Sequence, residues 1–289
     1  MKILSPAKIN LFLQVTGRRP DGYHELVTLM SHISLYDVMT FNFETAGISV
    51  RCDSAEVPDN DDNLAFKAAS LFYDRLPMVY QDHPGSGRHG GVSIFIEKHI
   101  PVAAGLGGGS SNAGRTLLQL NQYHGWPFST VEMNRMGLAI GADVPFFLQE
   151  KPAVATGIGE SLATYSRLQV LPIVVACPDI RVSTADVYKK LNLGLTNCGK
   201  KLKNFFSDKS AFDFKHYLCN DLETVTIPKY SVISDIKRHL LQTGADAALM
   251  SGSGPAVFGI YPELRKARRA CELLSANHRW RLFVAETLI

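Results

Sequence analysis

The chain has 289 residues, which is long enough for two domains, and 46% of them are hydrophobic, as is ordinary for a globular protein. Its formal net charge of +3 is too small to indicate a nucleic acid or a membrane surface as partner. Five cysteines without a Cys-x-x-Cys pair indicate neither a disulfide framework nor a zinc site. We find no signal peptide and no apolar run of the roughly 18 residues that a membrane span needs, so we expect a cytoplasmic protein.

The first half of the chain mixes strand and helix patterns. Residues 61–76 begin with Asp and Asn and then repeat apolar residues at helical spacing, and Ser129 and Glu132 form a Ser-x-x-Glu capping box. We expect strands at residues 9–15, 37–44, 47–52 and 87–100, a turn-rich loop at 17–25, and helices at 61–76, 110–125 and 129–141.

The pattern restarts near residue 168, after a strand-like segment at 145–162. We therefore expect two domains, at residues 1–160 and 161–289, and α+β organisation. In the second half we expect strands at residues 168–178 and 280–288, two short strands around a Ser-Gly turn at 247–262, and helices at 183–191, 213–223, 232–244 and 263–275.

A glycine-rich stretch, PVAAGLGGGSSNAGRT (Pro101–Thr116), joins a predicted strand to a predicted helix. A Rossmann fingerprint would need a third glycine that is missing here. Residues 109–116 differ from a P-loop at Arg115, which replaces the phosphate-binding lysine, although a Walker-B-like strand ends at Asp179. Helical spacing also places Arg115 inside a helix capped by Ser110 or Ser111, which argues against a P-loop NTPase.

The glycines in front of the two serines then favour a phosphate-binding loop. Backbone N–H groups at a helix N-terminus attract anions, and the hydroxyls of Ser110 and Ser111 could bind phosphate or Mg²⁺. The alternative is a flexible turn followed by a serine cap.

Four further segments carry a resemblance to a known family. Together with the glycine-rich stretch they resemble the GHMP kinases, which include galactokinase, homoserine kinase, mevalonate kinase and phosphomevalonate kinase. The resemblance implies a two-domain α+β fold, with an N-terminal domain like domain 2 of ribosomal protein S5 and a ferredoxin-like C-terminal domain. The segments are SPAKINLFLQVTGRRPDGYHEL (Ser5–Leu26), DNLAFKAA (Asp62–Ala69), LAIGADVPFFL (Leu138–Leu148) and MSGSGPAVF (Met250–Phe258).

The resemblance also implies phosphoryl transfer from ATP to a hydroxyl of a small molecule. Asp143 would be the base that accepts the hydroxyl proton, and Lys8 would orient Asp143 and stabilise negative charge. Taken alone, Asp143 could be an ordinary turn aspartate and Lys8 a solvated charge.

Through the DGYHEL segment, the resemblance further implies an acceptor that carries a cytosine base. Asn10 would hydrogen-bond the acceptor near the reacting hydroxyl, and His24 would hydrogen-bond the base edge. Tyr23 and Tyr188 would stack on the two faces of the base, although either aromatic ring could also serve core packing.

For ATP, the resemblance implies a phosphate loop and two residues at the adenine end, Asn63 and Lys98. Ser251, Gly252 and Ser253 resemble a third family motif that closes over the site, or else form a tight hairpin turn. We expect Mg²⁺ to be held mainly by the nucleotide and name no protein ligand for it. The phosphate loop comprises Pro101, Val102, Ala103, Ala104, Gly105, Leu106, Gly107, Gly108, Gly109, Ser110 and Ser111.

Two other functions remain open from the sequence. One is a GHMP kinase for a different small alcohol, such as homoserine or a mevalonate derivative, against which the DGYHEL segment and Tyr188 argue. The other is a non-catalytic ligand-binding protein on the same fold, against which the presence of both Lys8 and Asp143 argues. We expect a monomer or a weak homodimer.

Overall fold

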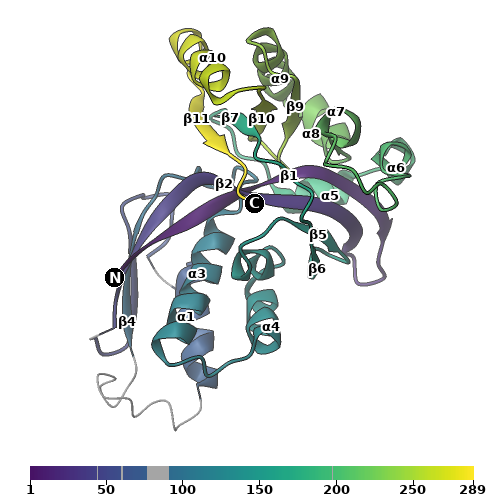
Figure 1. Cartoon of the computed structure of the whole chain (residues 1–289). Coiled ribbons are helices and arrows are strands. Elements are labelled where there is room, and N and C mark those ends of the chain that lie inside the picture. Colours follow the sequence, from purple (N-terminus) through teal and green to yellow (C-terminus); the bar gives the residue numbers. More distant parts are fainter. Residues whose placement is uncertain (44, 60, 77–90, 197) are drawn as a thin grey trace. The chain divides into compact units, whose positions relative to one another are not determined.

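The computed structural model describes residues 1–43, 45–59, 61–76, 91–196 and 198–289 (Figure 1). These residues form two compact units. Unit 1 comprises Met1–Ala7, Tyr36–Val102 and Gly107–Glu150, and unit 2 comprises Lys8–Leu35, Ala103–Leu106 and Lys151–Ile289. Neither unit is continuous in the sequence, so this division is a different one from the predicted domains 1–160 and 161–289, which stay a prediction.

Two long neighbouring strands, β1 (Lys2–Arg18) and β2 (His24–Asn42), contribute residues to both units. Both are longer than the strands predicted from the sequence. In β1 every residue from 5 to 13 is buried, so the strand does not show the alternation of apolar and polar residues that marks a half-exposed strand. Its buried polar residues Ser5, Lys8 and Asn10 also interrupt any continuous apolar run. This explains why the sequence pattern revealed only part of β1.

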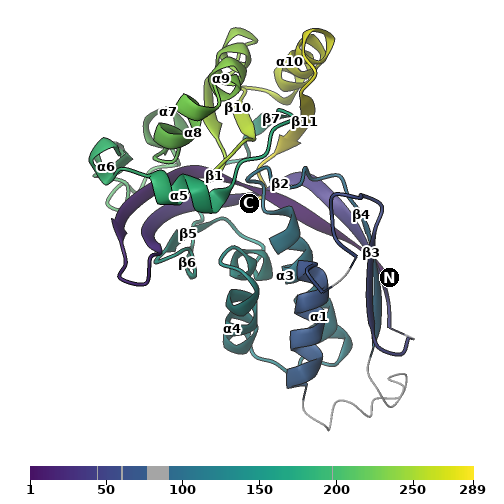
Figure 2. The ribbon, with the colours of Figure 1, turned by 180° about the vertical axis from the view of Figure 1, so that it is seen from behind.

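Unit 1 packs helices on a small sheet. Strand β3 (Ile48–Cys52) pairs in parallel with β4 (Val92–Glu97), which pairs antiparallel with the end of β2. The helices α1 (Leu64–Arg75) and α3 (Gly108–Tyr123) pack against each other, and α4 (Thr130–Ile140) packs on both (Figure 2). These elements confirm the predicted helices at 61–76, 110–125 and 129–141; residues 87–90 of the predicted strand at 87–100 lie outside the described residues.

The prediction of a strand-like segment at 145–162 is wrong over residues 145–148, in unit 1, and is confirmed at 153–156, which form a strand. Residues Val144–Leu148 form a short 3-10 helix, η1, with Pro145 in its first turn. Its residues Val144, Phe146 and Phe147 are buried. The apolar run reflects burial against α3 and α4, which a short run cannot distinguish from a strand.

The sheet that contains β1 and β2 also includes three short strands of unit 2. Strand β8 (Cys219–Asn220) pairs in parallel with β1, β5 (Ala153–Thr156) pairs antiparallel with β2, and β6 (Ser161–Thr164) pairs with β5. The pairing of β8 with β1 overturns the prediction of one helix over 213–223, because residues 219–220 are extended to meet β1 and separate two helices, α7 (Phe214–Tyr217) and α8 (Glu223–Lys229).

The second sheet of unit 2 has the strand order β11-β7-β10-β9, and its neighbouring strands run antiparallel. The helices α9 and α10 cover one face of it (Figure 1). This order and the β-α-β-β-α-β succession confirm the ferredoxin-like half. The elements are β7 (Pro172–Cys177), α9 (Val232–Gln242), β9 (Ala247–Met250), β10 (Val257–Ile260), α10 (Leu264–Asn277) and β11 (Arg281–Glu286).

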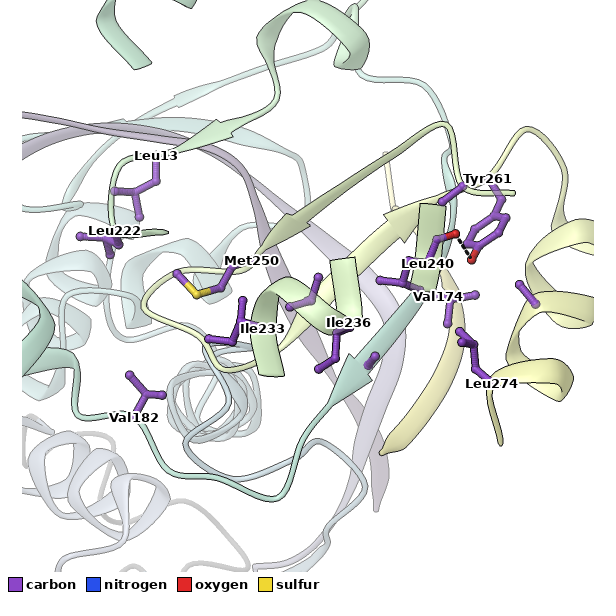
Figure 3. Packing of buried hydrophobic residues seen from close by; sticks show 14 of the residues in the cluster. Leu13, Val174, Val182, Leu222, Ile233, Ile236, Leu240, Met250, Tyr261 and Leu274 are labelled. Atoms are coloured by element: carbon purple, nitrogen blue, oxygen red, sulfur yellow. Dashed lines mark hydrogen bonds between the residues drawn. The ribbon is translucent and has the colours of Figure 1, made fainter. Parts of the chain in front are cut away.

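The core of unit 2 joins this sheet, its helices and β1 (Figure 3). Ile233, Ile236 and Leu240 of α9 are fully buried against Val174 and its neighbours. The Tyr261 hydroxyl donates to the carbonyl of Leu240, so this buried ring has a polar partner. Three short helices complete the unit: α5 (Thr184–Lys190), η2 (Leu193–Leu195) and α6 (Cys198–Lys201).

Within the described part of the chain, no helix is both long and apolar enough to cross a membrane. None of the five cysteines forms a disulfide bond in the described structure.

Candidate functional site

The helix that follows the glycine-rich stretch begins earlier than the sequence predicted. Helix α3 starts at Gly108, and its N-cap is Gly107, which has a φ of 70° and no side chain to cap with. The predicted serine cap is therefore wrong. Ser111 lies one turn inside the helix, where its Oγ is 2.7 Å from Oγ of Ser5.

An early helix start leaves the backbone N–H groups of residues 108–110 at the helix N-terminus, where they are available to an anion. Arg115 lies inside α3, as predicted, and its guanidinium is 3.7 Å from a carboxylate oxygen of Glu150. It therefore does not take the place of a P-loop lysine, which follows the last glycine at the start of the helix.

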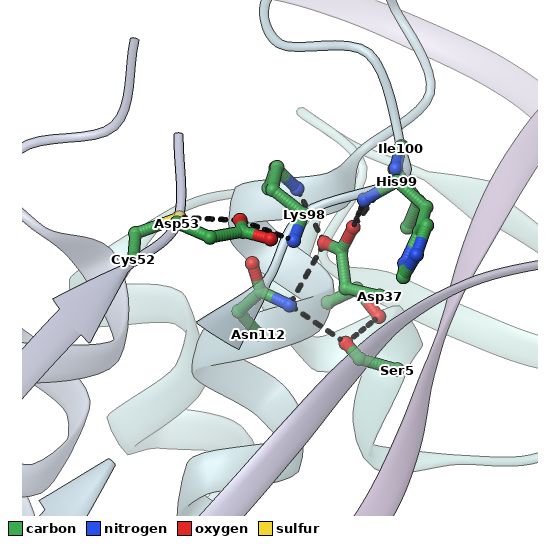
Figure 4. A network of polar contacts seen from close by, with 9 residues as sticks. Ser5, Asp37, Cys52, Asp53, Lys98, His99, Ile100 and Asn112 are labelled. Atoms are coloured by element: carbon green, nitrogen blue, oxygen red, sulfur yellow. Dashed lines mark hydrogen bonds and ion pairs between the residues drawn. The ribbon is translucent and has the colours of Figure 1, made fainter. Parts of the chain in front are cut away.

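A buried carboxylate that the sequence did not single out organises both flanks of the glycine-rich stretch. Asp37 of β2 is fully buried and forms an ion pair with Lys98 (Figure 4). One of its oxygens accepts the backbone N–H groups of His99 and Ile100, both at 2.9 Å, and the other accepts Nδ2 of Asn112 on α3 at 3.1 Å. Asp37 thus ties the segment before the stretch to the helix after it.

The Lys98 ammonium lies beside the first turn of α3. A Cβ added at Gly108 would be 2.7 Å from Nζ of Lys98, so a side chain there would displace the end of this lysine. The ammonium and the helix N-terminus are both positive, and Asp37 compensates them in the absence of another anion. Lys98 was predicted at the adenine end, but its ammonium lies beside the start of the helix that follows the glycine-rich stretch, and its contact with ATP stays a prediction.

Asn63, the other residue predicted at the adenine end, caps helix α1. Its Oδ1 accepts the N–H of Ala65 at 2.9 Å, and its Nδ2 donates to the carbonyl of Pro58 at 2.8 Å. The Asn63 side chain is therefore engaged in holding the start of α1, and its contact with a nucleotide stays a prediction.

In unit 2, residues Ala103–Leu106 lie against the third predicted motif. Oγ of Ser251 donates to the carbonyl of Gly105 at 3.0 Å, and the N–H of Ala256 donates to the carbonyl of Ala104 at 3.1 Å. Gly105 has a φ of 79°, and a Cβ there would be 2.3 Å from the Ser251 carbonyl. Even Ala103, which is not a glycine, has a φ of 52°, a backbone conformation that is uncommon for residues with a side chain.

A chain of buried polar side chains connects β1 to β2 in the same unit. Nζ of Lys8 donates to Oδ1 of Asn10 at 2.6 Å, and Nδ2 of Asn10 donates to Oγ1 of Thr28 at 2.8 Å. Thr28 donates in turn to the carbonyl of Phe12 at 2.6 Å. Lys8 is only 4% exposed, so it is not the solvated surface charge that a lone lysine usually is.

The backbone of Gly252 lies against this chain. A Cβ added at Gly252 would be 3.4 Å from both Nζ of Lys8 and Oδ1 of Asn10. Ser253, the last residue of the motif, has its Oγ 2.8 Å from Oγ1 of Thr184 at the start of α5. The structure therefore brings Lys8, Asn10 and the Ser251–Ser253 motif together.

The predicted base-binding residues meet in part. The ring centroids of His24 and Tyr188 are 5.3 Å apart, with an angle of 35° between the planes. Burial, and then the nearby charge of Arg18, lower the pKa of His24, which favours the neutral imidazole, a form that accepts as well as donates a hydrogen bond. Tyr23 is 60% exposed, so a large part of its ring is accessible for stacking.

Asp143, the predicted base, precedes η1 in unit 1 and is half-buried. The helix packing fixes the segment that follows it: Gly114 of α3 and Gly137 of α4 both face η1. A Cβ added at Gly114 would be 2.8 Å from Cβ of Phe147, so the glycine permits close packing. The described residues hold no group of three or more His, Cys, Asp or Glu side chains arranged for a metal ion.

Sequence reasoning missed Asp37 and Thr28, and it recognised nothing in the segment that contains Asn220. Asp37 and Thr28 both lie in strand β2. A polar residue in a buried strand indicates a buried hydrogen bond, but the sequence does not show which residue is its partner. Asn220 has no such signal, because its partners are 30 and 32 residues later in the chain.

Comparison with known proteins agrees with these observations along the whole chain. Residues 63–151 match the family described as GHMP kinases N terminal domain, and residues 209–278 match GHMP kinases C terminal. A 4-diphosphocytidyl-2-C-methyl-D-erythritol kinase of Syntrophotalea carbinolica is 44% identical over 284 residues, 98% of this chain and 97% of the relative. Another protein of that name, from Syntrophus aciditrophicus, is 43% identical over 100% of this chain and 99% of its own.

Solved structures agree as well. A crystal structure of 4-(cytidine 5'-diphospho)-2C-methyl-D-erythritol kinase matches with a TM-score of 0.80 and 33% identity over the full length of both chains. A homoserine kinase of Cytophaga hutchinsonii shares the fold, with a TM-score of 0.71 at 16% identity over 100% of this chain and 95% of its own. The chain belongs to the GHMP kinase family.

Proposed function

We propose that the protein transfers the γ-phosphoryl group of ATP to the 2-hydroxyl of 4-diphosphocytidyl-2-C-methyl-D-erythritol, in the non-mevalonate synthesis of isoprenoid precursors. The names of full-length relatives at 43–44% identity support this acceptor. The structural observation that carries the proposal is the pair of His24 and Tyr188 rings, 5.3 Å apart, in the unit that also holds Lys8 and Asn10. An acceptor with a cytosine base needs such a polar and aromatic surface.

In this reaction the oxygen of the acceptor hydroxyl forms a bond to the γ-phosphorus, and the bond from that phosphorus to the bridging oxygen of ADP breaks. Asp143 takes the hydroxyl proton as the new bond forms. The Lys8 ammonium, held by Oδ1 of Asn10 at 2.6 Å, stabilises the negative charge that develops near the nucleophile. Pro101–Ser111 bind the phosphates through backbone N–H groups.

Mg²⁺ would neutralise phosphate charge in this reaction, and we propose that nucleotide oxygens and water hold it. The residues near the phosphate loop fit this arrangement: both oxygens of Asp37 already accept hydrogen bonds, and the hydroxyl of Ser111 is paired with that of Ser5. By the family resemblance, Asp143 is the acidic side chain expected to approach the reacting groups. We assign no protein ligand to Mg²⁺.

A coupled assay of ADP release tests the proposal directly. The purified protein is given ATP and, separately, the cytidyl acceptor, homoserine or mevalonate. We expect ADP release with ATP and the cytidyl acceptor, and none with ATP and either homoserine or mevalonate. Release with homoserine or mevalonate and none with the cytidyl acceptor would assign the chain to a different GHMP kinase reaction, and specific binding without any turnover would indicate a non-catalytic protein.

The proposal also includes a cytoplasmic location and a monomeric or weakly dimeric state. Light scattering over a range of protein concentrations tests the latter. A mass of one chain of 31.8 kDa at low concentration is the expected result, and a concentration-independent higher oligomer would contradict it.

A further inference from the structure

The side chain of Asn220 in unit 2 hydrogen-bonds the backbone of the Ser251–Gly254 turn and of the residue before it. Nδ2 of Asn220 donates to the carbonyl of Met250 at 2.9 Å and to the carbonyl of Gly252 at 2.7 Å. Its Oδ1 accepts the N–H of Leu222 at 2.9 Å. Asn220 is 6% exposed, so these bonds replace contacts with water.

The same residue is fixed to the strand that carries Lys8 and Asn10. Asn220 pairs with Leu13 of β1 in parallel register, and the N–H of the next residue, Asp221, donates to the Leu13 carbonyl at 2.9 Å. The Asn220 side chain therefore links β1 to a turn that begins more than 30 residues after Asn220 in the sequence.

The turn that it holds touches the proposed catalytic groups. Gly252 has a φ of 55°, and a Cβ on it would be 3.4 Å from Nζ of Lys8 and from Oδ1 of Asn10. A shift of the turn by a fraction of an ångström would therefore change the space around the ammonium. A displacement of about 1 Å at a catalytic group can cost on the order of 100-fold in rate.

Other side chains hold the turn at its edges. Oε1 of Glu223 accepts the N–H of Met250 at 2.9 Å, and Oγ1 of Thr226 is 3.4 Å from the Ser253 carbonyl. Only Asn220, among the hydrogen bonds that the structure gives for described residues, binds the carbonyl of Gly252, the residue that faces Lys8. It is thus the contact through which the turn is set against the site.

We propose that Asn220 is a positioning residue for phosphoryl transfer, which sets the Ser251–Gly254 turn against Lys8 and Asn10. The inference rests on the proposed function, because it takes Lys8 as a group that acts on the reacting phosphoryl. The carboxamide is suited to this role because its NH₂ group offers two donors to two carbonyls.

Steady-state kinetics of three variants test it. Asn220→Ala removes both donors, Asn220→Asp keeps the shape but sets an acceptor against two carbonyls, and Asn220→Ser keeps a single hydroxyl donor. We expect kcat to fall about 10- to 100-fold in the first two and less in the third, with KM for ATP within about 3-fold of wild type. An unchanged kcat in Asn220→Ala would overturn the inference.

The neighbouring Asp221 supplies the matched control. It is 2% exposed and accepts the N–H groups of Val15 at 2.9 Å and Cys198 at 3.1 Å, so it ties β1 to the start of α6. Asp221→Asn should lower stability to a similar degree and leave kcat near wild type. A loss of kcat in this control as large as in Asn220→Ala would reduce Asn220 to a general structural role.

Amide hydrogen exchange provides a readout that needs neither substrate. The amides of residues 251–254 should exchange faster in Asn220→Ala, and in Asn220→Ser if the alanine variant does not fold, than in the wild type or in Asp221→Asn. If the wild type fails to phosphorylate the cytidyl acceptor, the proposed function is refuted, and unchanged exchange at the turn separately refutes the role of Asn220.

Discussion

The residues that sequence reasoning assigned to chemistry differ in how the structure supports them. Lys8 and Asn10 are joined by a 2.6 Å hydrogen bond inside the protein, where a lysine needs a partner. His24 and Tyr188 are brought together from positions far apart in the sequence. The Asn63 side chain bonds backbone groups of Ala65 and Pro58, and Lys98 is paired with Asp37, so nucleotide contacts there would add to existing bonds or exchange them.

The role of Asp143 predicts a large effect of a small change. Asp143→Asn keeps the size of the side chain but removes the carboxylate that accepts the hydroxyl proton. We expect kcat with the cytidyl acceptor to fall about 10²- to 10⁴-fold, the usual contribution of a general base. Single-turnover kinetics measure this, and turnover close to that of the wild type would remove Asp143 from the mechanism.

The role of Tyr188 predicts a selective effect. Tyr188→Ala removes a ring from beside His24, so the acceptor should bind more weakly, with KM raised about 5- to 150-fold for about 1–3 kcal/mol of lost stacking. KM for ATP should change little, and Tyr188→Phe, which keeps the ring, is the matched control. An equal rise in both KM values would indicate that Tyr188 supports the fold of unit 2 instead.

Asp37 predicts a loss of stability. Asp37→Asn leaves the Lys98 ammonium buried without its countercharge, and breaking a buried ion pair typically costs about 3–5 kcal/mol. Urea unfolding measures it. Asp53→Asn is the control, since the exposed Asp53 accepts the Lys98 backbone N–H at 2.8 Å and, weakly, the Sγ–H of Cys52, and should cost less than about 1.5 kcal/mol.

At the scale of elements, close packing of helices through glycine determines where the segment after Asp143 lies. Helix α3 meets η1 at Gly114, where a Cβ would be 2.8 Å from that of Phe147. The sequence marks this glycine only as an unfavourable helix residue. Tertiary contact supplies the reason for it.

Gly114→Ala should therefore destabilise the protein although alanine favours helices. We expect a loss of about 1–3 kcal/mol from overpacking and a lower kcat, because η1 begins directly after Asp143. Gly109→Ala, on the same helix, would meet only Cδ1 of Leu64 at 3.4 Å and should not lower stability. Thermal unfolding of both variants decides; equal stability would show that η1 can shift without cost.

At the scale of the whole molecule, two histidines with lowered pKa link stability to pH. Burial lowers the pKa of His24 and of His278, whose ring stacks on Trp280 at 4.0 Å between centroids and faces His239 at 4.4 Å. The unfolded chain binds these protons more readily than the folded one. Stability is therefore fully present above the unfolded pKa of about 6.5 and falls as the pH drops below it.

The dependence of Tm on pH measures this link. Between about pH 7.5 and 5.5, Tm of the wild type should fall, and His278→Gln should flatten that fall because one such histidine is gone. His216→Gln, an exposed histidine on α7, is the matched control. A slope unchanged by His278→Gln would contradict the assignment of this histidine.

Much of the fold could be predicted from the sequence, because local patterns carry it. The capping box of α4 and the Asn63 cap of α1 are confirmed, since a cap involves residues two or three apart. The predictions fail where a distant segment decides. Residues 219–220 are extended because β1 pairs with them, and residues 144–148 turn helical against α3 and α4.

The sequence by itself determined the family, the ferredoxin-like succession of elements and which residues carry charge and aromatic rings, because these depend on order along the chain. Tertiary structure alone decided which of them meet. Asp37 joins both flanks of the phosphate loop, Asn220 reaches Gly252, and Gly252 lies against Lys8. Hydrogen bonds and packing act over a few ångströms, whereas these partners are separated by dozens to hundreds of residues, so only the folded chain brings them within range.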